Sequence, residues 1–253
     1  MLENIRLSLK GIWSHKMRSF LTMLGIIIGI AAIIAIVSTI KGTNEQIKNN
    51  LIGSGTNTVT IQLYQDNWPA DFSYTAPPPG IPTFNSDTKE QILALDGVAQ
   101  VSFLHMRNYC DSMYYLNNSL TSCSVYGIDD SYLSTAGLQI TKGRGFSQAD
   151  LTGSKAVCLI DETAYSSGFQ GEDPLGKVVD IMGQPFTVVG VVNQKTKFEP
   201  VINSIQDYYT YANTSNGVVY IPDQMWPVVF QYDEPQAVIV RAENTDAMTN
   251  AGK

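Results

Sequence analysis

The side chains that most often do chemistry are few in this chain, and they do not gather into a recognisable site. The 253 residues include two histidines, His15 and His105, and neither stands in a cysteine or carboxylate pattern typical of metal ligands. The adjacent acids Asp129-Asp130 and Asp161-Glu162 suit a turn or the start of a helix. The sequence has no Gly-x-x-x-x-Gly-Lys-Ser/Thr loop for nucleotide phosphates and no serine in a nucleophile-elbow pattern. We therefore predict no catalytic, cofactor-binding or metal-binding residue in this chain.

The three cysteines are the remaining reactive groups. Cys110 and Cys123 flank a predicted hairpin around Asn117-Asn118, whose short loop would bring the two cysteines opposite each other. They are candidates for a disulfide, and two separate thiols are the alternative. Cys158 lies in the apolar run 156–160, so we expect it to be a buried thiol.

The position of these groups relative to a membrane depends on the longest apolar stretch of the sequence. Residues from Ser19 to Ile40 form a run of 22 without one charged side chain. At about 1.5 Å per helical residue this run is long enough to cross the roughly 30 Å hydrocarbon core of a bilayer. A cleavable signal peptide is the rival interpretation, but its apolar region is shorter, and no Ala-x-Ala site follows here. We predict an uncleaved transmembrane helix at residues 19–41.

The distribution of charge orients this helix. The residues before Ser19 carry four basic side chains and one acid, Glu3. Basic residues next to a membrane span stay on the cytoplasmic side, so the N-terminus should be cytoplasmic and residues 42–253 extracytoplasmic. The chain as a whole has 16 Lys and Arg against 23 Asp and Glu. An acidic exterior repels a phosphate backbone, which argues against a nucleic-acid partner.

The segment before the span has an apolar stripe at helical spacing. The stripe consists of Leu2, Ile5, Leu9, Ile12, Trp13 and Met17. This pattern predicts an amphipathic helix over residues 1–18 that lies on the inner leaflet. Lys10, Trp13 and Lys16 are candidates for contact with the membrane interface or with a cytoplasmic ATPase, and the sequence does not separate these alternatives.

Two glycines mark one face of the span. Gly25 and Gly29 form a Gly-x-x-x-Gly pair, which lets another helix approach closely. We predict packing against a further transmembrane helix along this face. The alternative is that the pair reflects only the tolerance of membrane helices for glycine.

Beyond the membrane, strand and helix patterns interleave, and this predicts an α+β (mixed α/β) extracytoplasmic domain. The predicted strands span residues 56–63, 98–109, 120–128, 155–160, 178–182, 186–192, 218–221 and 237–242. The predicted helices span residues 43–52, 86–95, 130–137 and 161–169, with another that begins near Pro222-Asp223 and a last near Asn244. A proline-rich insertion at about 68–83 reads as an exposed loop, either a contact loop or a plain insertion.

Several segments together resemble one family, the MacB-type permeases of ABC transporters. The opening matches the family's signature at Arg18-Ser19, Leu21-Thr22 and Leu24-Gly25-Ile26. Later landmarks follow in order at Leu51–Asn57, Lys142–Phe146, Asp173–Lys177, Phe186–Val192 and Val219–Pro222. The resemblance spans nearly the whole chain, and the ordered set is more specific than any of its pieces.

The resemblance implies an ectodomain of two subdomains, one of βαβ type, on a permease in the cell (inner or cytoplasmic) membrane. It implies a homodimer or heterodimer of permeases with four spans per protomer and a partner ABC ATPase, which would hold ATP and Mg. An adaptor protein and membrane lipid are further expected partners. Family members continue into three more spans, so we expect this chain, which stops at Lys253, to be a fragment that lacks the C-terminal spans.

The implied activity is export or extrusion of a peptide, antibiotic or lipid-like cargo, driven by ATP hydrolysis in the cytoplasm. One rival is a single-span anchored protein whose ectodomain binds a cell-wall component or a receptor. A second is a relative of the lipoprotein-release permeases. The first rival would need no ATPase, which makes recruitment of an ATPase the discriminating property.

Overall fold

The computed structural model describes residues 16–53, 57–65, 68–70, 72, 77–81, 84–110, 112–120, 122–194, 217–230, 234–243 and 247. The chain divides into two compact units, 1–49 and 50–253, and each is described by itself. The predicted amphipathic helix before residue 16 and the predicted helix near Asn244 lie outside the described residues.

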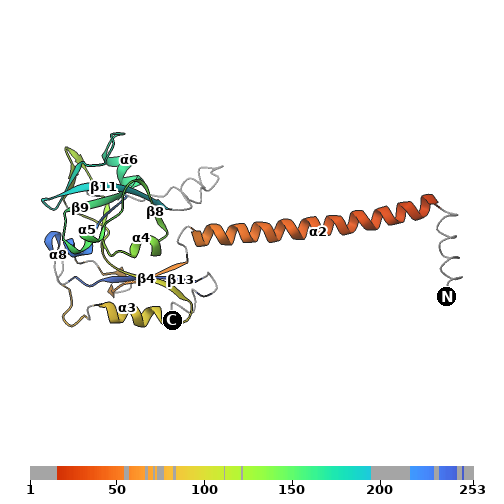
Figure 1. Cartoon of the computed structure of the whole chain (residues 1–253), viewed down its shortest axis with the longest axis horizontal. Coiled ribbons are helices and arrows are strands. Elements are labelled where there is room, and N and C mark those ends of the chain that lie inside the picture. The colour runs from red at the N-terminus through yellow and green to blue at the C-terminus, as the bar shows by residue number, and fades with distance from the viewer. Residues whose placement is uncertain are drawn as a thin grey trace. The chain divides into compact units, whose positions relative to one another are not determined.

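The first described element is one long helix, α2 (Lys16–Gly53), of 38 residues. Its part from Lys16 to Asn44 is apolar and long enough to cross a membrane, and the side chains described there are exposed. The helix continues through the polar stretch that was predicted to extend it and ends at Gly53 (Figure 1). Its length is therefore about 57 Å, well beyond the thickness of a bilayer core.

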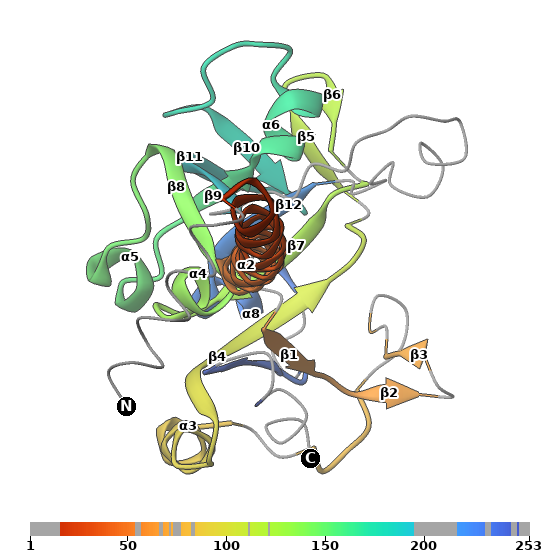
Figure 2. The same cartoon turned by 90° about the vertical axis from the view of Figure 1, so that its right-hand side faces the viewer.

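The second unit is built on one large mixed sheet. Its strands are β1 (Thr58–Ile61), β4 (Val98–Arg107), β5 (Met113–Tyr115), β6 (Asn118–Ser119), β7 (Ser124–Ile128), β8 (Leu138–Gly143), β9 (Val157–Asp161), β10 (Val178–Ile181), β11 (Gln184–Gln194), β12 (Val218–Pro222) and β13 (Ala237–Ala242). Their order across the sheet is β1-β13-β4-β7-β12-β9-β11-β10-β5-β6, with β8 also paired to β11. Figure 2 shows the β5–β6 hairpin and α6 at one end of this unit and α3 at the other.

Parallel and antiparallel pairs alternate in the middle of the sheet. β12 runs parallel to β7, and β11 runs parallel to β9. The chain passes from β9 through α6 (Glu162–Gly168) and β10 before it returns as β11, which is the crossover that a parallel pair requires. The predicted mixed α/β class is thus confirmed. Because the strands form one hydrogen-bonded sheet, the division into two subdomains stays a prediction.

Strands β4 and β13 are buried on both faces. Val101, Phe103 and Val240 pack toward α3 (Ser86–Leu93), where Phe84 stacks on Phe103 with ring centroids 5.2 Å apart. Leu104 and Ile239 belong to a second apolar cluster, on the side of α4 (Tyr132–Thr135). This two-sided burial agrees with the apolar residues on both faces of each strand, although β4 also carries Gln100, Ser102, His105 and Arg107.

The largest apolar cluster lies around β5 and the strands β9 to β12. Its bulkiest fully buried members include Trp226, Phe169 and Phe186. Trp226 begins α8 (Trp226–Val229), which follows a short 3-10 turn, η1 (Asp223–Met225). The ring lies against Gly127 of β7, where an added Cβ would stand 2.8 Å from Trp226 Cε3. The helix predicted to begin near Pro222-Asp223 is therefore confirmed, and its aromatic residue is a main part of the core.

Several elements were missed, and one loop was only partly right. The short strands β5 and β6 lie between the predicted strands 98–109 and 120–128, where only a turn was predicted. β8 and α5 (Gln148–Thr152) stand where no element was predicted. The proline-rich insertion begins with a small hairpin, β2 (Tyr64–Gln65) and β3 (Trp68–Pro69). The turn between β10 and β11 is at Met182-Gly183, where both residues have positive φ, and not at Gly183–Pro185 as predicted.

The segment from Lys142 to Phe146 owes its composition to a close approach between β8 and β11. Gly143 has φ +72°, and a Cβ there would collide with the carbonyl oxygen of Val189. Gly145 has no positive φ, and its nearest neighbour for an added Cβ is Ile140 Cδ1 at 3.7 Å. Only the first glycine of this segment is therefore required by the backbone.

We predict that Gly143→Ala lowers the free energy of unfolding by roughly 1–3 kcal/mol, because alanine must adopt a left-handed backbone and push β11 away. Gly145→Ala is the matched control and should be nearly neutral. Urea unfolding of the chain in detergent, followed by tryptophan fluorescence, measures both. Equal effects of the two variants would contradict this account of the segment.

The same region holds a buried carboxylate at the start of α5. Asp150 accepts hydrogen bonds from the backbone N–H and hydroxyl of Ser147, and its Oδ2 lies 2.5 Å from Arg144 Nη1. Burial by itself would raise the pKa of Asp150, but the hydrogen bonds from Arg144 and Ser147 outweigh it and hold this pKa well below its usual range.

A carboxylate with a lowered pKa stabilises the fold above its unfolded pKa and loses that effect as the pH falls toward the folded value. We therefore expect Asp150→Asn to cost about 2 kcal/mol at pH 7. The gap to the wild type should close progressively below about pH 4. Asp130→Asn, at an exposed surface carboxylate, is the control and should change little. A gap that persists unchanged at acid pH would contradict the linkage.

Candidate functional site

The predicted site residues of the membrane helix lie on α2. Gly25 and Gly29 are one turn apart, and an added Cβ at either would meet nothing within 4 Å in the described part of the chain. Their face is thus open, and packing against a second helix stays a prediction. Lys16 is the first residue of α2, whereas Lys10 and Trp13 lie outside the described residues.

The two acid pairs singled out from the sequence have structural roles. Asp161 is the N-cap of α6, and its Oδ1 accepts a hydrogen bond from Ala164 N at 2.7 Å. Burial raises the pKa of Asp161, and backbone hydrogen bonds such as that from Ala164 partly offset this rise. Asp129 accepts hydrogen bonds from Ser102 Oγ at 2.5 Å and Lys89 Nζ at 2.8 Å. Both carboxylates hold the fold in place.

The structure brings together a charged cluster that was not predicted. It consists of His105 and Arg107 of β4, Asp223 of η1, Trp226 of α8 and Glu234, which precedes β13. Arg107 forms a two-point ion pair with Glu234, in which Nε donates to Oε2 at 3.3 Å and Nη2 donates to Oε1. The side chains of Arg107 and Glu234 are 10% and 3% exposed, so the pair is largely removed from water.

Three neighbouring residues make further contacts with Arg107 or Glu234. Trp226 Nε1 donates to Glu234 Oε2 at 3.2 Å, and the Arg107 guanidinium lies 4.6 Å over the Phe230 ring. His105 stacks on Trp226, with its Nδ1 2.6 Å from Asp223 Oδ1 and its Nε2 3.1 Å from the carbonyl oxygen of Glu234. The cluster therefore links β4, through side-chain contacts, to η1 and α8 and to the residues just before β13.

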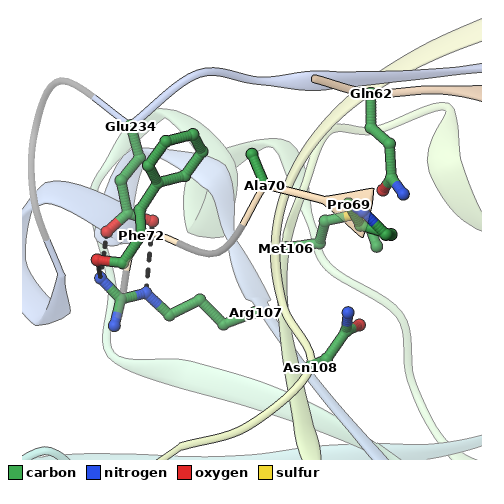
Figure 3. A pocket seen from close by; sticks show the side chains of 8 residues that line it. All are labelled: Gln62, Pro69, Ala70, Phe72, Met106, Arg107, Asn108 and Glu234. Atoms are coloured by element: carbon green, nitrogen blue, oxygen red, sulfur yellow. Dashed lines mark hydrogen bonds and ion pairs between the residues drawn. The ribbon is translucent and has the colours of Figure 1, made fainter. Parts of the chain in front are cut away.

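A pocket of about 340 Å³ opens beside this cluster. Its lining residues are Gln62, Pro69, Ala70, Phe72, Met106, Arg107, Asn108 and Glu234. Figure 3 shows the guanidinium of Arg107 bonded to Glu234 and to the Phe72 carbonyl along one wall, with the amides of Gln62 and Asn108 on the other side. The pocket lies where the C-terminal ends of β1 and β4 meet the N-terminal end of β13.

The polar groups of this pocket can form hydrogen bonds and ion pairs. Its charged groups neutralise each other, and its other polar groups are carboxamides, which donate and accept hydrogen bonds. In the described part of the chain, no group of three His, Cys, Asp or Glu is arranged to hold a metal ion. One sequence signal could have pointed here. His105 and Arg107 stand two apart on a strand whose middle, Val101–Leu104, is buried, so they share one face and need polar partners there.

The similarity to known proteins extends over most of the chain and does not depend on this pocket. The family model described as MacB-like periplasmic core domain matches residues 19–253. The chain is 36% identical over 266 residues to the uncharacterized ABC transporter permease YvrN of Bacillus subtilis, covering all of this chain and 59% of that protein. It is 32% identical over 228 residues to the macrolide export ATP-binding/permease protein MacB of Aggregatibacter actinomycetemcomitans, covering 86% of this chain and 33% of that one.

Two solved structures share the fold. The periplasmic region of MacB from Actinobacillus actinomycetemcomitans gives a TM-score of 0.53 at 22% identity, over 81% of this chain and 86% of that one. The extracellular domain of the ABC-type transporter YknZ from Gram-positive bacteria gives 0.50 at 21% identity, over 78% and 89%. The chain thus spans about three fifths of the YvrN relative and a third of the MacB relative.

We predict that Glu234→Gln destabilises the domain by about 3–5 kcal/mol, because it leaves the buried Arg107 guanidinium without its counter-charge. Glu172→Gln is the matched control, since Glu172 forms an exposed pair with Lys177 at 3.4 Å. An exposed pair of this kind contributes about 0–1 kcal/mol. Thermal unfolding followed by the fluorescence of the buried Trp226 compares them. Similar small losses in both variants would contradict a stabilising role for the cluster.

Proposed function

This chain belongs to the family of the MacB-like periplasmic core domain, and from this we propose that it is the N-terminal part of an ABC transporter permease subunit. The subunit is anchored in the cytoplasmic membrane with its N-terminus inside and its large domain outside. It couples ATP hydrolysis by a partner ATPase to movement of that domain, and so exports or extrudes a peptide, antibiotic or lipid-like cargo. Permeases of this kind work as homodimers or heterodimers, and an adaptor protein is a further partner.

The single observation that carries this proposal is the uninterrupted helix α2. A span of residues 19–41 would suffice for an anchor, but the helix continues to Gly53 without a break. A helix is stiff along its axis because every backbone group in it is hydrogen bonded to the next turn. A rod that begins at the cytoplasmic face and extends beyond the membrane is suited to carry a displacement from one side to the other.

The remaining observations favour ATP hydrolysis by a partner protein or domain. The sequence holds no phosphate-cradling loop, so ATP and Mg do not fit residues of this chain and belong to another polypeptide or domain. The rival of a single-span anchored receptor needs no such partner. A relative that releases lipoproteins would share the ATPase and differ in cargo.

We expect the tagged subunit that contains this chain, purified from its native membrane, to bring with it a cytoplasmic protein with ATPase activity. Gly25→Leu with Gly29→Leu should lower that activity several-fold, because leucines on this face hold neighbouring spans apart. The measurement is ATP hydrolysis per mole of subunit in lipid nanodiscs. Circular dichroism should show an unchanged ectodomain, which lies outside the altered helix.

The matched control is Ile27→Leu with Ala31→Leu. This pair has the same spacing on the opposite face of the helix, about 200° around the axis, and should leave the activity intact. Activity that is equal in both double variants would remove the packing hypothesis. Failure of any ATPase to co-purify would favour the anchored receptor instead.

A further inference from the structure

The pocket beside Arg107 continues into a smaller cavity of about 30 Å³, and the two cavities form one groove. They share the lining residues Gln62, Ala70, Phe72, Met106 and Glu234. The smaller cavity follows the consecutive residues from Glu234 to Ala237, the last of which begins β13. A groove that runs along consecutive residues of the chain suits an extended ligand.

One wall of this groove is the start of the proline-rich insertion. Pro69 ends the β2–β3 hairpin, and the next residue, Ala70, donates its backbone N–H to Leu63 O at 2.9 Å. The carbonyl oxygen of Phe72 accepts a hydrogen bond from Arg107 Nη2 at 3.2 Å, which fastens this wall to β4. The first described residues of the insertion thus line a cavity, and this favours a contact loop over a plain insertion.

Three polar groups at the groove retain unused hydrogen-bonding capacity. The carboxamides of Gln62 and Asn108 form no hydrogen bond with any residue in the part of the chain that the structure describes, and Figure 3 shows both across from the ion pair. Arg107 uses Nε and Nη2 for Glu234 and Phe72, whereas its Nη1 forms no hydrogen bond within these same residues. The Arg107 side chain is only 10% exposed, and a ligand oxygen in the groove would give Nη1 the acceptor that a buried N–H requires.

The charges and the apolar side chains of the groove restrict the ligand further. Arg107 and Glu234 already neutralise each other in a two-point ion pair. A ligand carboxylate would lie near Glu234 and a ligand ammonium near Arg107, so either would exchange its water for a like charge. Phe72 and Met106 offer an apolar surface instead, and the flexible side chain of Met106 can adapt to different aliphatic groups.

We propose that this groove binds an uncharged, extended peptide segment with an apolar side chain. A trans peptide group presents its carbonyl oxygen and its N–H on opposite edges. The carboxamides of Gln62 and Asn108 can donate to the one and accept from the other, and Arg107 Nη1 can donate to a second carbonyl. The site deepens the proposed function, on which it rests only in identifying the bound peptide as cargo.

The test titrates the whole chain in lipid nanodiscs with the capped dipeptide N-acetyl-leucyl-alaninamide. Methionine-methyl NMR reports the site, because Met106 lines the groove whereas Met113 is buried in a different apolar cluster. We expect a saturable shift of the Met106 signal, none of the Met113 signal, and a Kd on the order of 1 mM. The free acid and the free amine of the same dipeptide should each bind about fivefold more weakly or worse. Equal binding of the three forms, or no saturable shift, would overturn the proposal.

Variants at the two carboxamides provide a second readout. Gln62→Leu and Asn108→Leu remove no side-chain hydrogen bond of the described fold, so the Tm should stay close to that of the wild type. Each should weaken binding of the capped dipeptide about 2–10-fold, as expected for the loss of one hydrogen bond. Gln139→Leu, at an exposed carboxamide on β8, is the matched control and should bind like the wild type. Unchanged binding in both groove variants would contradict the assignment of these groups.

Two further outcomes separate this site from its rivals and from the proposed function. N-acetylglucosamine is an uncharged, amide-bearing ligand without a peptide backbone, and tighter binding of this sugar at Met106 would overturn the peptide assignment in favour of the anchored receptor. Co-purification of an ATPase together with no shift at Met106 would remove the peptide site alone. A saturable shift at Met106 in a subunit that recruits no ATPase would uphold the site and count against the proposed function.

Discussion

A helix can lie in lipid because it satisfies every backbone hydrogen bond within itself, and this constraint governs the rest of the chain. From Ser19 to Ile40 α2 carries no charged side chain, so no charged group has to leave water when this segment enters lipid. The four bases before Ser19 and the acidic domain after Ile40 stand at opposite ends of this segment, and bases next to a membrane span favour the cytoplasmic side.

The large domain is held together by pairings between distant parts of the chain. β1 begins five residues after α2 ends, and it pairs with β13 from Thr58 opposite Arg241 to Ile61 opposite Val238. The strand nearest to the membrane helix in the sequence is thus hydrogen bonded to the strand nearest to the end of the domain. β13 in turn pairs with β4 along its whole length. Backbone hydrogen bonds therefore join β1 through β13 to β4 in the middle of the chain.

Sequence patterns predicted the elements well where burial imposes a period, and less well elsewhere. The strands around Val98–Arg107 and Ala237–Ala242 were predicted because most of their residues are apolar, as burial on both faces requires. β8 was missed because it is mostly exposed, and Leu138 and Ile140 alone carry its alternation. The turn after β10 was misplaced because Pro185 suggested a loop, whereas it lies in β11 opposite Asp180. The charged cluster lay beyond such patterns, since His105 and Asp223 are 118 residues apart in the sequence.

The charged cluster can fix the register between β4 and β13, which apolar pairs alone would fix only weakly. Four of the six residue pairs between β13 and β4 join two apolar side chains, so a slip of the register by two residues would exchange some apolar pairs for others at little cost. The same slip would draw Glu234 away from Arg107 and leave two buried charges apart, which costs several kcal/mol. A buried ion pair adds little net stability over an apolar pair of the same volume, but it distinguishes one register from another. We infer that Arg107 and Glu234 define how β13 aligns with β4, and with it the walls of the neighbouring pocket.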